Sequence, residues 1–327
     1  MKIRPLSLAV LTVLLILPAA VTRAQVIGVA DNSIYQLTPQ SSFEEGCFPP
    51  CLCITHYYDG LIGTFRMTPG APDPRFQVFD ITEVNWLVPR LGYRVTGKGT
   101  YRIGGEFARM HQLQLDLKIA DRDVQHYDSG LVQGGAEFPA IDLAIAMNGM
   151  ICTDTVFHVQ AKPTLPIQAI PFFLKGSSYQ EGCYGPCLCV IVAHPLLGRF
   201  GLLKLNETNQ GTDYAVIDIN WQVRQSNTSP ANDSTPVTGY GLYRLSRADG
   251  TQRMLLDLVE NGRGPTRFDS GTVPGGGSPK QIDVDVAANG FACYDRVYSI
   301  HARGRAGNPA LLGLSPEPVT LPITEIP

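Results

Sequence analysis

Apolar and polar residues alternate along many short stretches of the chain, and this period of two is typical of half-buried β-strands. Residues 113–119 read LQLDLKI, and residues 254–258 read MLLDL with the apolar positions in the same phase. Apolar side chains also occupy every second position around the two tryptophans, Trp86 and Trp221, which we therefore expect inside a core. The pattern predicts strands throughout the chain.

Turn signals separate these stretches at intervals of about ten residues. Asn148 and Gly149 divide two runs, 141–147 and 150–159, and an Asn-Gly pair in such a place favours a two-residue β-hairpin of type I′. No convincing helical period interrupts the pattern. The sequence therefore predicts an all-β fold made of antiparallel β-sandwich or barrel-like domains.

An internal duplication organises the chain. Residues 41–53, SSFEEGCFPPCLC, return as residues 177–189, SSYQEGCYGPCLC, and the Asp-Ser-Gly triplet at 128–130 returns at 269–271. Further matches follow in the same order, with a larger offset after an additional polar stretch at 226–233. Two copies of this length indicate a pair of domains rather than a long repeat array.

The duplication gives the predicted boundaries. The two copies, 33–161 and 177–303, are expected to be tandem homologous β domains. A Pro-rich linker, 162–176, separates them, and a Pro-rich extended tail, 304–327, follows the second copy. Proline lacks a backbone N–H and interrupts regular structure, so we interpret the first segment as the domain boundary and the second as an extended or poorly ordered end.

The first 24 residues have the pattern of a secretory signal peptide. Lys2 and Arg4 precede an apolar stretch at 6–17, and small residues lead to a cleavage position after Ala24. The apolar stretch is too short to span a bilayer. We therefore expect a secreted, periplasmic or cell-surface protein, with no transmembrane segment in the mature chain that begins at Gln25.

The charge of the chain argues against one class of partner. The 327 residues have a formal net charge of −3, and removal of residues 1–24 takes away three basic groups and no acidic one, which leaves −6. Proteins that bind nucleic acids present a clustered basic surface. Nucleic acid is therefore not an expected partner.

Eight cysteines fall into two matching groups, each with a Cys-x3-Cys-x-Cys segment near the start of a copy and a fourth cysteine on its last predicted strand. They are Cys47, Cys51, Cys53, Cys152, Cys183, Cys187, Cys189 and Cys293. Export favours disulfide bonds. A four-thiolate zinc or iron–sulfur site is the alternative, but the spacing matches no standard cluster.

Geometry narrows the pairing without settling it. In an extended strand, the Cα atoms of Cys51 and Cys53 would lie about 6.6 Å apart with parallel side chains, which is poor geometry for a bond between them. Cys47 is therefore expected to pair with one of these two residues and Cys152 with the other. Either pairing ties the last strand to the first segment of the domain, and the same reasoning applies to the second copy.

Histidines and serines form no catalytic constellation in the sequence. None of the six histidines has a histidine at the matching position of the other copy, which excludes a His-based metal or acid–base site shared by both domains. The Asp-Ser-Gly triplets lack the Gly-x-Ser-x-Gly context of a nucleophile. We interpret them as turns, because Asp bonds the backbone two residues on and Gly tolerates a positive φ.

Carboxylates are the candidate site residues, because several recur at matching positions of the two copies. The set comprises Asp116, Asp142, Asp154, Asp257, Asp283 and Asp295. If neighbouring strands bring some of them together, they would form a polar site or a site for a structural calcium ion, or the acid and base of a glycosidase. The competing interpretation is a set of solvated acids that pair with Arg102 and Arg244 or cap turns.

These observations predict an exported, disulfide-stabilised protein that binds a ligand or serves a structural role without catalysis. The expected partner is a surface or matrix ligand, either a glycan or a protein. The alternative is a carbohydrate-active enzyme with paired carboxylates. Two matching acids about 5–10 Å apart in a concave groove with exposed aromatic side chains would favour the enzyme.

Overall fold

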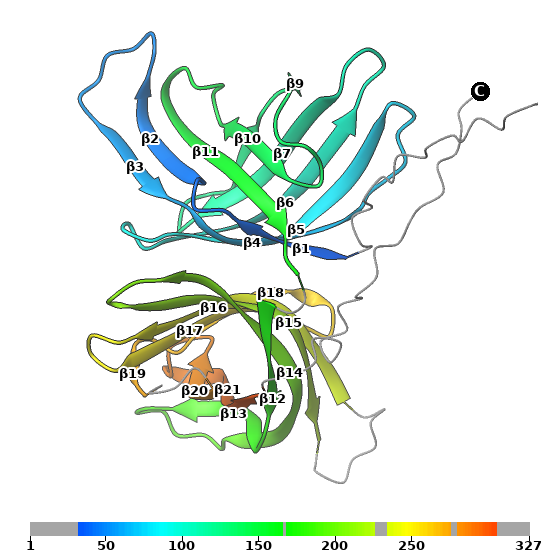
Figure 1. Ribbon diagram of the computed structural model, residues 1–327. Helices are drawn as coiled ribbons and strands as arrows, with labels where there is room; N and C mark the ends of the chain where they lie inside the picture. Colours follow the sequence, from blue (N-terminus) through cyan, green and yellow to red (C-terminus); the bar gives the residue numbers. More distant parts are fainter. Residues whose placement is uncertain (1–31, 166–167, 226–233, 276–279, 306–327) are drawn as a thin grey trace, which may run out of the picture.

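Two antiparallel sheets make up the protein, one in each half of the chain (Figure 1). The computed structural model describes residues 32–165, 168–225, 234–275 and 280–305. These residues contain β-strands and no α-helix, so the predicted all-β class with two tandem domains is confirmed. No helical segment with the length and hydrophobicity needed to cross a membrane occurs among them.

The first domain is a meander in which most strands pair with their neighbours in sequence. Its strands are β1 (Ser33–Leu37), β2 (Ser42–Phe48), β3 (His56–Gly60), β4 (Ile62–Pro69), β5 (Phe76–Val88), β6 (Tyr93–Gly104), β7 (Met110–Ile119), β8 (Gln125–Asp128), β9 (Val132–Gln133), β10 (Ile141–Ala146) and β11 (Cys152–Pro163). The sheet runs from β4 through β5, β6, β7, β8 and β10 to β11, and the short strand β9 pairs with β7.

This sheet closes into a barrel because its first and last strands meet. The long strand β11 pairs with β2 along residues 152–158 and with β1 along residues 161–163. β1 pairs in turn with β4, which completes the circle. Of the two arrangements that the sequence left open, sandwich or barrel, the structure has the barrel, and closure satisfies the strand edges.

The second domain closes in the same way. Its strands are β12 (Ala169–Leu174), β13 (Ser177–Tyr184), β14 (Val192–Glu207), β15 (Gly211–Arg224), β16 (Ser234–Ser246), β17 (Thr251–Glu260), β18 (Arg263–Asp269), β19 (Val273–Pro274), β20 (Gln281–Ala287) and β21 (Cys293–Gly304). The 16-residue strand β14 pairs with β12, β13 and β15. β12 also pairs with the last strand, β21, and thereby closes the second barrel.

Apolar side chains fill both barrels. Trp86 and Trp221 are fully buried, as the alternation predicts. The ring centroid of Trp86 lies 5.7 Å from that of Phe157, and the ring centroid of Trp221 lies 5.7 Å from that of Tyr298. Aromatic pairs of this kind contribute about 0.5–1.5 kcal/mol each beyond the burial of area. The barrel interiors are therefore packed cores.

All eight cysteines form disulfides, as predicted for an oxidising compartment. The bonds are Cys47–Cys53, Cys51–Cys152, Cys183–Cys189 and Cys187–Cys293. In each domain, one bond closes a loop with a sequence separation of six, and the other joins that loop to the first residue of the last strand. Both domains thus use the same one of the two pairings that the sequence left open.

Strands extend into the region predicted as a linker. β11 ends at Pro163 and β12 begins at Ala169, so much of 162–176 belongs to the two barrels. Proline is compatible with these positions because a residue at a strand end, or one whose nitrogen points away from the ladder, has no hydrogen bond to donate. The predicted signal peptide, 1–24, and residues 306–327 of the predicted tail lie outside the described residues.

The barrels contact each other through the outer faces of β4–β6 and β14–β17 (Figure 1). Part of this interface is apolar. Ile34 from the first domain is buried in one cluster with Ala169, Leu203, Ala215 and Ile217 from the second. Burial of these side chains favours association of the two domains, because it removes apolar surface from water.

Ion pairs extend the interface beyond this apolar cluster. Arg94 on β6 is buried and contacts Asp257 of the second domain, with 2.7 Å between Nη2 and Oδ2. Asn85, which is fully buried beside Arg94, donates a hydrogen bond of 2.6 Å to the carbonyl of Gly241. A buried charge is costly unless it is paired, so this contact requires both domains to be in place.

A second arginine bridges the two domains. Arg66 on β4 donates to Glu83 of its own domain at 2.9 Å and to Asp218 of the other domain at 2.7 Å. Both acids have a positive φ, 52° and 51°, at interruptions of the strand register. β-Bulges of this kind redirect a side chain, and here both redirected carboxylates contact the same guanidinium.

Candidate functional site

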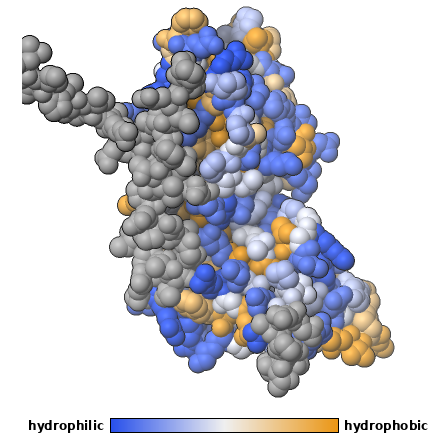
Figure 2. Space-filling model, turned by 90° about the vertical axis from the view of Figure 1, so that its right-hand side faces the viewer, coloured by the Kyte–Doolittle hydropathy of each residue, from blue (hydrophilic) through white to orange (hydrophobic). Residues whose placement is uncertain are grey.

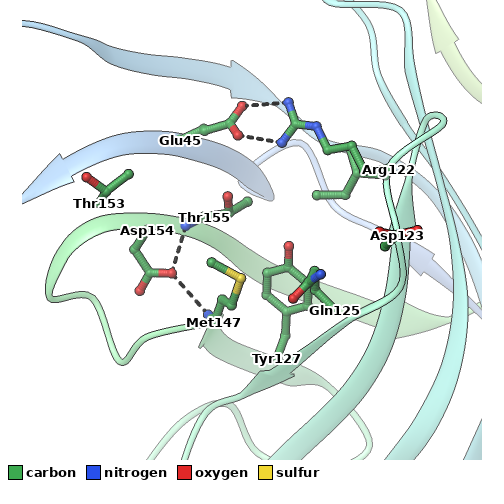
Figure 3. Close-up of a pocket in the computed structure, with 10 residues that line it drawn as sticks. Glu45, Arg122, Asp123, Gln125, Tyr127, Met147, Thr153, Asp154 and Thr155 are labelled. Carbon is green, nitrogen blue, oxygen red and sulfur yellow. Dashed lines mark hydrogen bonds and ion pairs between the residues drawn. The ribbon is translucent and has the colours of Figure 1, made fainter.

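A pocket of about 350 Å³ opens at the disulfide end of the first barrel (Figure 3). Its walls come from β2, β11, the β7–β8 turn and the loop between β10 and β11. The lining residues are Glu45, Ile119, Arg122, Asp123, Gln125, Tyr127, Met147, Thr153, Asp154 and Thr155. A concave space of this volume with a few convergent polar groups is typical of small-ligand sites.

An ion pair forms one wall of the pocket. Glu45 on β2 accepts two hydrogen bonds, of 2.5 and 3.1 Å, from the guanidinium of Arg122 in the β7–β8 turn. The same guanidinium lies over the ring of Tyr93, 5.3 Å from its centroid. The hydrogen bonds to Glu45 raise the pKa of Arg122. The bidentate contact and the ring contact together hold the arginine in one orientation.

A buried aspartate shapes the opposite wall. Asp154 is 1% exposed, and its carboxylate accepts hydrogen bonds from the backbone N–H groups of Met147, Asn148, Met150 and Thr155, at 2.7–3.2 Å. These bonds fold the loop that carries Met147 into the pocket wall (Figure 3). The carboxylate is therefore a structural acceptor, and its lone pairs are already used.

This loop corrects one expectation from the sequence. Asn148-Gly149 was expected to form a two-residue type I′ hairpin, but β10 ends at Ala146 and β11 begins at Cys152. Positive φ values occur at Gly149, Met150 and Cys152, at 68°, 63° and 56°, but not at Asn148, where a type I′ turn on the Asn-Gly pair would require one. The reason is the buried carboxylate, which draws the backbone N–H groups inward and makes the loop wider than a tight turn.

Tyr127 lies at the base of the pocket. Its side chain is buried, and the hydroxyl points toward Thr155 (Figure 3). Burial raises the pKa of Tyr127 to about 12, so the hydroxyl stays protonated at neutral pH. It can therefore donate a hydrogen bond as well as accept one.

The remaining lining groups are mostly polar and uncharged, with one exposed carboxylate, Asp123. Gln125 and Asp123 are exposed, and the hydroxyls of Thr153 and Thr155 complete the polar wall, while Met147 adds an adaptable apolar contact. The carboxylates of Glu45 and Asp154 are both committed to fixed partners. Neither has the free environment that a general acid or base needs.

The same end of the second barrel is filled by side chains. Sequence matching places Arg296 where the first domain has Thr155, and Arg296 forms an ion pair with Glu260 and lies 5.4 Å from the ring centroid of Phe268. Tyr294, which replaces Thr153, donates a hydrogen bond to Glu181. Arg296 therefore occupies the region that is open in the first domain, whereas Tyr294 remains 57% exposed.

The structure separates the six candidate aspartates instead of gathering them. Asp116 contacts His126 at 2.8 Å and Asp142 contacts His158 at 2.8 Å, while Asp283 contacts His301 at 3.0 Å. Each of these pairs lies on neighbouring strands and is partly exposed. Within the described residues, no three His, Cys, Asp or Glu side chains are arranged to hold a metal ion.

The other three aspartates have structural partners. Asp257 pairs with Arg94 in the interface. Asp295 repeats the role of Asp154, because its carboxylate accepts hydrogen bonds of 2.8 Å from the backbone of Asn289 and Phe291. These three carboxylates are buried and bind the chain itself. Asp154 and Asp295 hold turns, as the competing interpretation expected. Asp257, however, is neither solvated nor paired with Arg102 or Arg244.

The matching aspartates Asp142 and Asp283 each contact a histidine, although the two histidines are not at matching positions of the copies. The residue directly across the strand pair from Asp283 is His301, whereas the residue across from Asp142 is Gln160, and His158 reaches Asp142 from a diagonal position. Matching residues one by one missed this, because the two histidines come from different positions. Both contacts are surface pairs between single residues.

The Asp-Ser-Gly triplets are turns in the structure. Ser129 accepts a hydrogen bond from the backbone of Leu113 at 3.0 Å, and Ser270 accepts one from Met254 at 2.9 Å. The glycines that follow have φ values of 65° and 63°. Each serine hydroxyl also donates to the carbonyl of that glycine, so it is used in the turn.

Comparisons of the chain with protein-family models, curated proteins and solved structures found no match. The pocket is therefore interpreted from its own residues. Sequence analysis did not single out Arg122, Tyr127 or Met147 for this site. Arg122 and Glu45 are far apart in the sequence, and only closure of the barrel brings them together.

Proposed function

We propose that the protein is an exported, non-enzymatic binding protein and that its ligand occupies the pocket at the disulfide end of the first domain. The observation that carries this proposal is an open pocket in which the two inner carboxylates, Glu45 and Asp154, are already bound, while the third, Asp123, is exposed at the rim. Export is supported by the N-terminal pattern of residues 1–24 and by the four disulfides. The repeated sequence supports a duplicated β domain, and the different side chains at the matching end of the second barrel favour the first copy as the one that binds this ligand.

The chemistry of the pocket favours a glycan as the ligand. Sugar hydroxyls both donate and accept hydrogen bonds, as do the hydroxyls of Tyr127 and Thr155 and the amide of Gln125. The Glu45–Arg122 pair offers fixed acceptor and donor edges on the same wall. Met147 supplies an apolar contact for the face of a sugar ring.

A carbohydrate-active enzyme is the second candidate, and the pocket supports it less well. Hydrolysis requires one carboxyl group that gives up a proton and a second one that attacks or activates water. Glu45 is paired with Arg122, and Asp154 accepts several backbone hydrogen bonds. Both carboxylates are therefore already bound to donors of the protein, and neither is placed to exchange a proton with a ligand.

A glycan array with the mature chain, residues 25–327, tests the proposal. The pocket variant carries Thr153→Tyr and Thr155→Arg, which imitate the filled end of the second domain. Asp116→Asn, on the exposed face of β7, is the matched control. We expect the wild type and the control to bind the same glycans and the pocket variant to lose at least tenfold in affinity.

A hydrolysis screen on the glycans that bind distinguishes the two candidates. We expect no product with the wild type after long incubation. Product formation that disappears in Glu45→Gln would replace the binding protein with the enzyme. Equal glycan binding by the wild type and the pocket variant would remove the pocket from the proposal, and a wild type that binds no glycan would overturn the ligand class.

A further inference from the structure

Exposed apolar side chains gather on the disulfide-linked loops of the first domain. Leu52 and Ile54, in the loop between β2 and β3, are completely exposed, and Met150 and Ile151, in the loop before β11, are 39% and 58% exposed. The bond Cys51–Cys152, with Cα atoms 4.8 Å apart, joins the two loops. The four side chains therefore belong to one surface, which we call cap 1.

The second domain has a corresponding surface. Leu188 is completely exposed and Val190 is 80% exposed, while Ile191 and Val192 are 44% and 49% exposed. The bond Cys187–Cys293 ties this loop to the start of β21. We call the four side chains cap 2.

Disulfides prevent the caps from withdrawing into the protein. Each exposed leucine stands between two cysteines that are bonded to different partners, so the loop cannot collapse onto the barrel. Figure 1 shows the β2–β3 hairpin projecting beyond the first barrel. On the face drawn in Figure 2, apolar side chains are interrupted by hydrophilic ones. Clustered exposed apolar side chains mark an interaction surface.

The caps carry no charge. The loop segments 48–55, 147–153, 184–193 and 288–294 contain no Asp, Glu, Lys, Arg or His. The mature chain outside them is acidic overall. Surfaces that bind anionic lipids present clustered Lys and Arg, so the caps are complementary to a neutral surface and not to an anionic one.

Exposed tyrosines lie beside both caps. Tyr57 and Tyr58 on β3, close to cap 1 in the sequence, are 57% and 63% exposed, and Tyr294, next to Cys293, is 57% exposed. Tyrosine is enriched where an apolar surface meets water, because its ring is apolar and its hydroxyl is wet. An apolar cap with tyrosines beside it suits the boundary between lipid head groups and acyl chains better than a dry protein groove.

We propose that caps 1 and 2 dock the protein on an electrically neutral lipid surface, into which their aliphatic side chains insert. Insertion covers Leu52, Ile54, Leu188 and Val190, which the fold leaves in water. The role is additional to ligand binding in the pocket, although cap 1 shares the loop before β11 with the pocket wall. It makes the protein a peripheral membrane protein without a membrane-spanning helix among its described residues.

Flotation with phosphatidylcholine vesicles tests this proposal. We expect the mature wild type to float with the vesicles. We expect Leu52→Asn with Ile54→Asn, and separately Leu188→Asn with Val190→Asn, to lower the bound fraction several-fold, and the combination of all four to abolish flotation. Replacement of a third of the lipid by phosphatidylglycerol should not strengthen binding.

Phe107→Asn is the matched control, because Phe107 is 99% exposed but lies in the β6–β7 turn outside both caps. It should float like the wild type. Intact disulfides by non-reducing mass mapping and unchanged tryptophan fluorescence establish that each variant is folded. The proposal is overturned if the wild type does not float, if the fourfold variant floats equally well, or if Phe107→Asn has the same effect.

Sedimentation velocity separates lipid docking from self-association. We expect a monomer for the wild type and for the fourfold variant without vesicles. An oligomer that the fourfold variant dissociates, together with absent flotation, would assign the caps to a contact between copies of this chain and would overturn the lipid proposal.

Discussion

The disulfide ends of the two barrels have the same scaffold and different contents. Cys152 and Cys293 have similar positive φ values, 56° and 49°, and each is followed two residues later by a buried aspartate that binds the preceding loop. The first domain has Thr155 after this aspartate and a pocket, whereas the second has Arg296 and a filled end. The comparison indicates that the backbone and disulfides maintain the fold, while a few inward side chains decide whether a site exists.

The two disulfides of the first domain should differ in their contribution to stability. In the chain-entropy model, Cys51–Cys152, with a sequence separation of 101, contributes about 4–5 kcal/mol. Cys47–Cys53, with a separation of six, contributes about 2 kcal/mol. We expect the double Cys→Ser variant of the long-range bond to lose about 2–3 kcal/mol more free energy of unfolding in urea than the variant of the short-range bond. Equal losses would show that loop length does not determine the effect.

Of the two matching aspartates Asp116 and Asp257, only Asp257 should contribute strongly to the free energy of unfolding. Asp257→Asn leaves the buried Arg94 without its anion, and we expect a loss of about 3–5 kcal/mol in the free energy of unfolding. Asp116→Asn removes an exposed contact with His126 and should cost less than about 1 kcal/mol. Guanidinium unfolding of both variants measures the difference. Similar values would contradict the buried interface.

Arg296→Thr should weaken the filled end of the second domain. It leaves Glu260 with the hydroxyl of Tyr298 at 2.6 Å, and we expect a loss of about 1–3 kcal/mol. Each domain contains one tryptophan, so Trp86→Phe in the background makes Trp221 report on the second domain alone. Thr155→Arg is the reciprocal change, and it should leave the unfolding of the second domain unchanged.

The smallest change in stability is expected from the titration of Asp128, in the Asp-Ser-Gly turn of the first domain. Burial alone would raise the pKa of Asp128, but hydrogen bonds from Gln112 and Gln114 outweigh it and hold the pKa below its ordinary value. The carboxylate therefore stabilises the fold above about pH 4, and this contribution disappears as the pH falls through the lowered pKa.

Asp128→Asn tests this sign. The melting temperature of the variant should be below that of the wild type at pH 7, by an amount equivalent to less than about 1 kcal/mol. The two should converge below pH 3. A difference that grows as the pH falls would contradict the lowered pKa.

The alternation of apolar residues was sufficient to predict the fold class. Strict period two around Trp86 and Trp221 indicated strands and buried tryptophans, and both are found. Closure into barrels could not be read from the pattern, because sandwich and barrel strands alternate alike. It depends on β11 pairing with both β1 and β2, which are separated by a short break.

The site was less accessible to sequence analysis. Matched carboxylates pointed to Asp154, but not to its role as a backbone acceptor, since that role depends on the wide loop beside it. Asp116 and Asp257 stand in similar local sequences, yet the first is exposed and the second is buried. Their environments differ because only Asp257 faces the other domain. The sequence of a single strand does not indicate which of its faces a neighbouring domain will cover.

The walls of the pocket come from opposite ends of the first domain's sequence, so the pocket can form only after the whole domain has been synthesised. Glu45 stands near the beginning of the first domain and Asp154 near its end, and both walls meet only when β11 has paired with β2. A nascent chain that has reached residue 140 contains most of the strands of this barrel but no binding site. The pocket is thus the last feature of the domain to be completed, and a chain that stops before β11 lacks it.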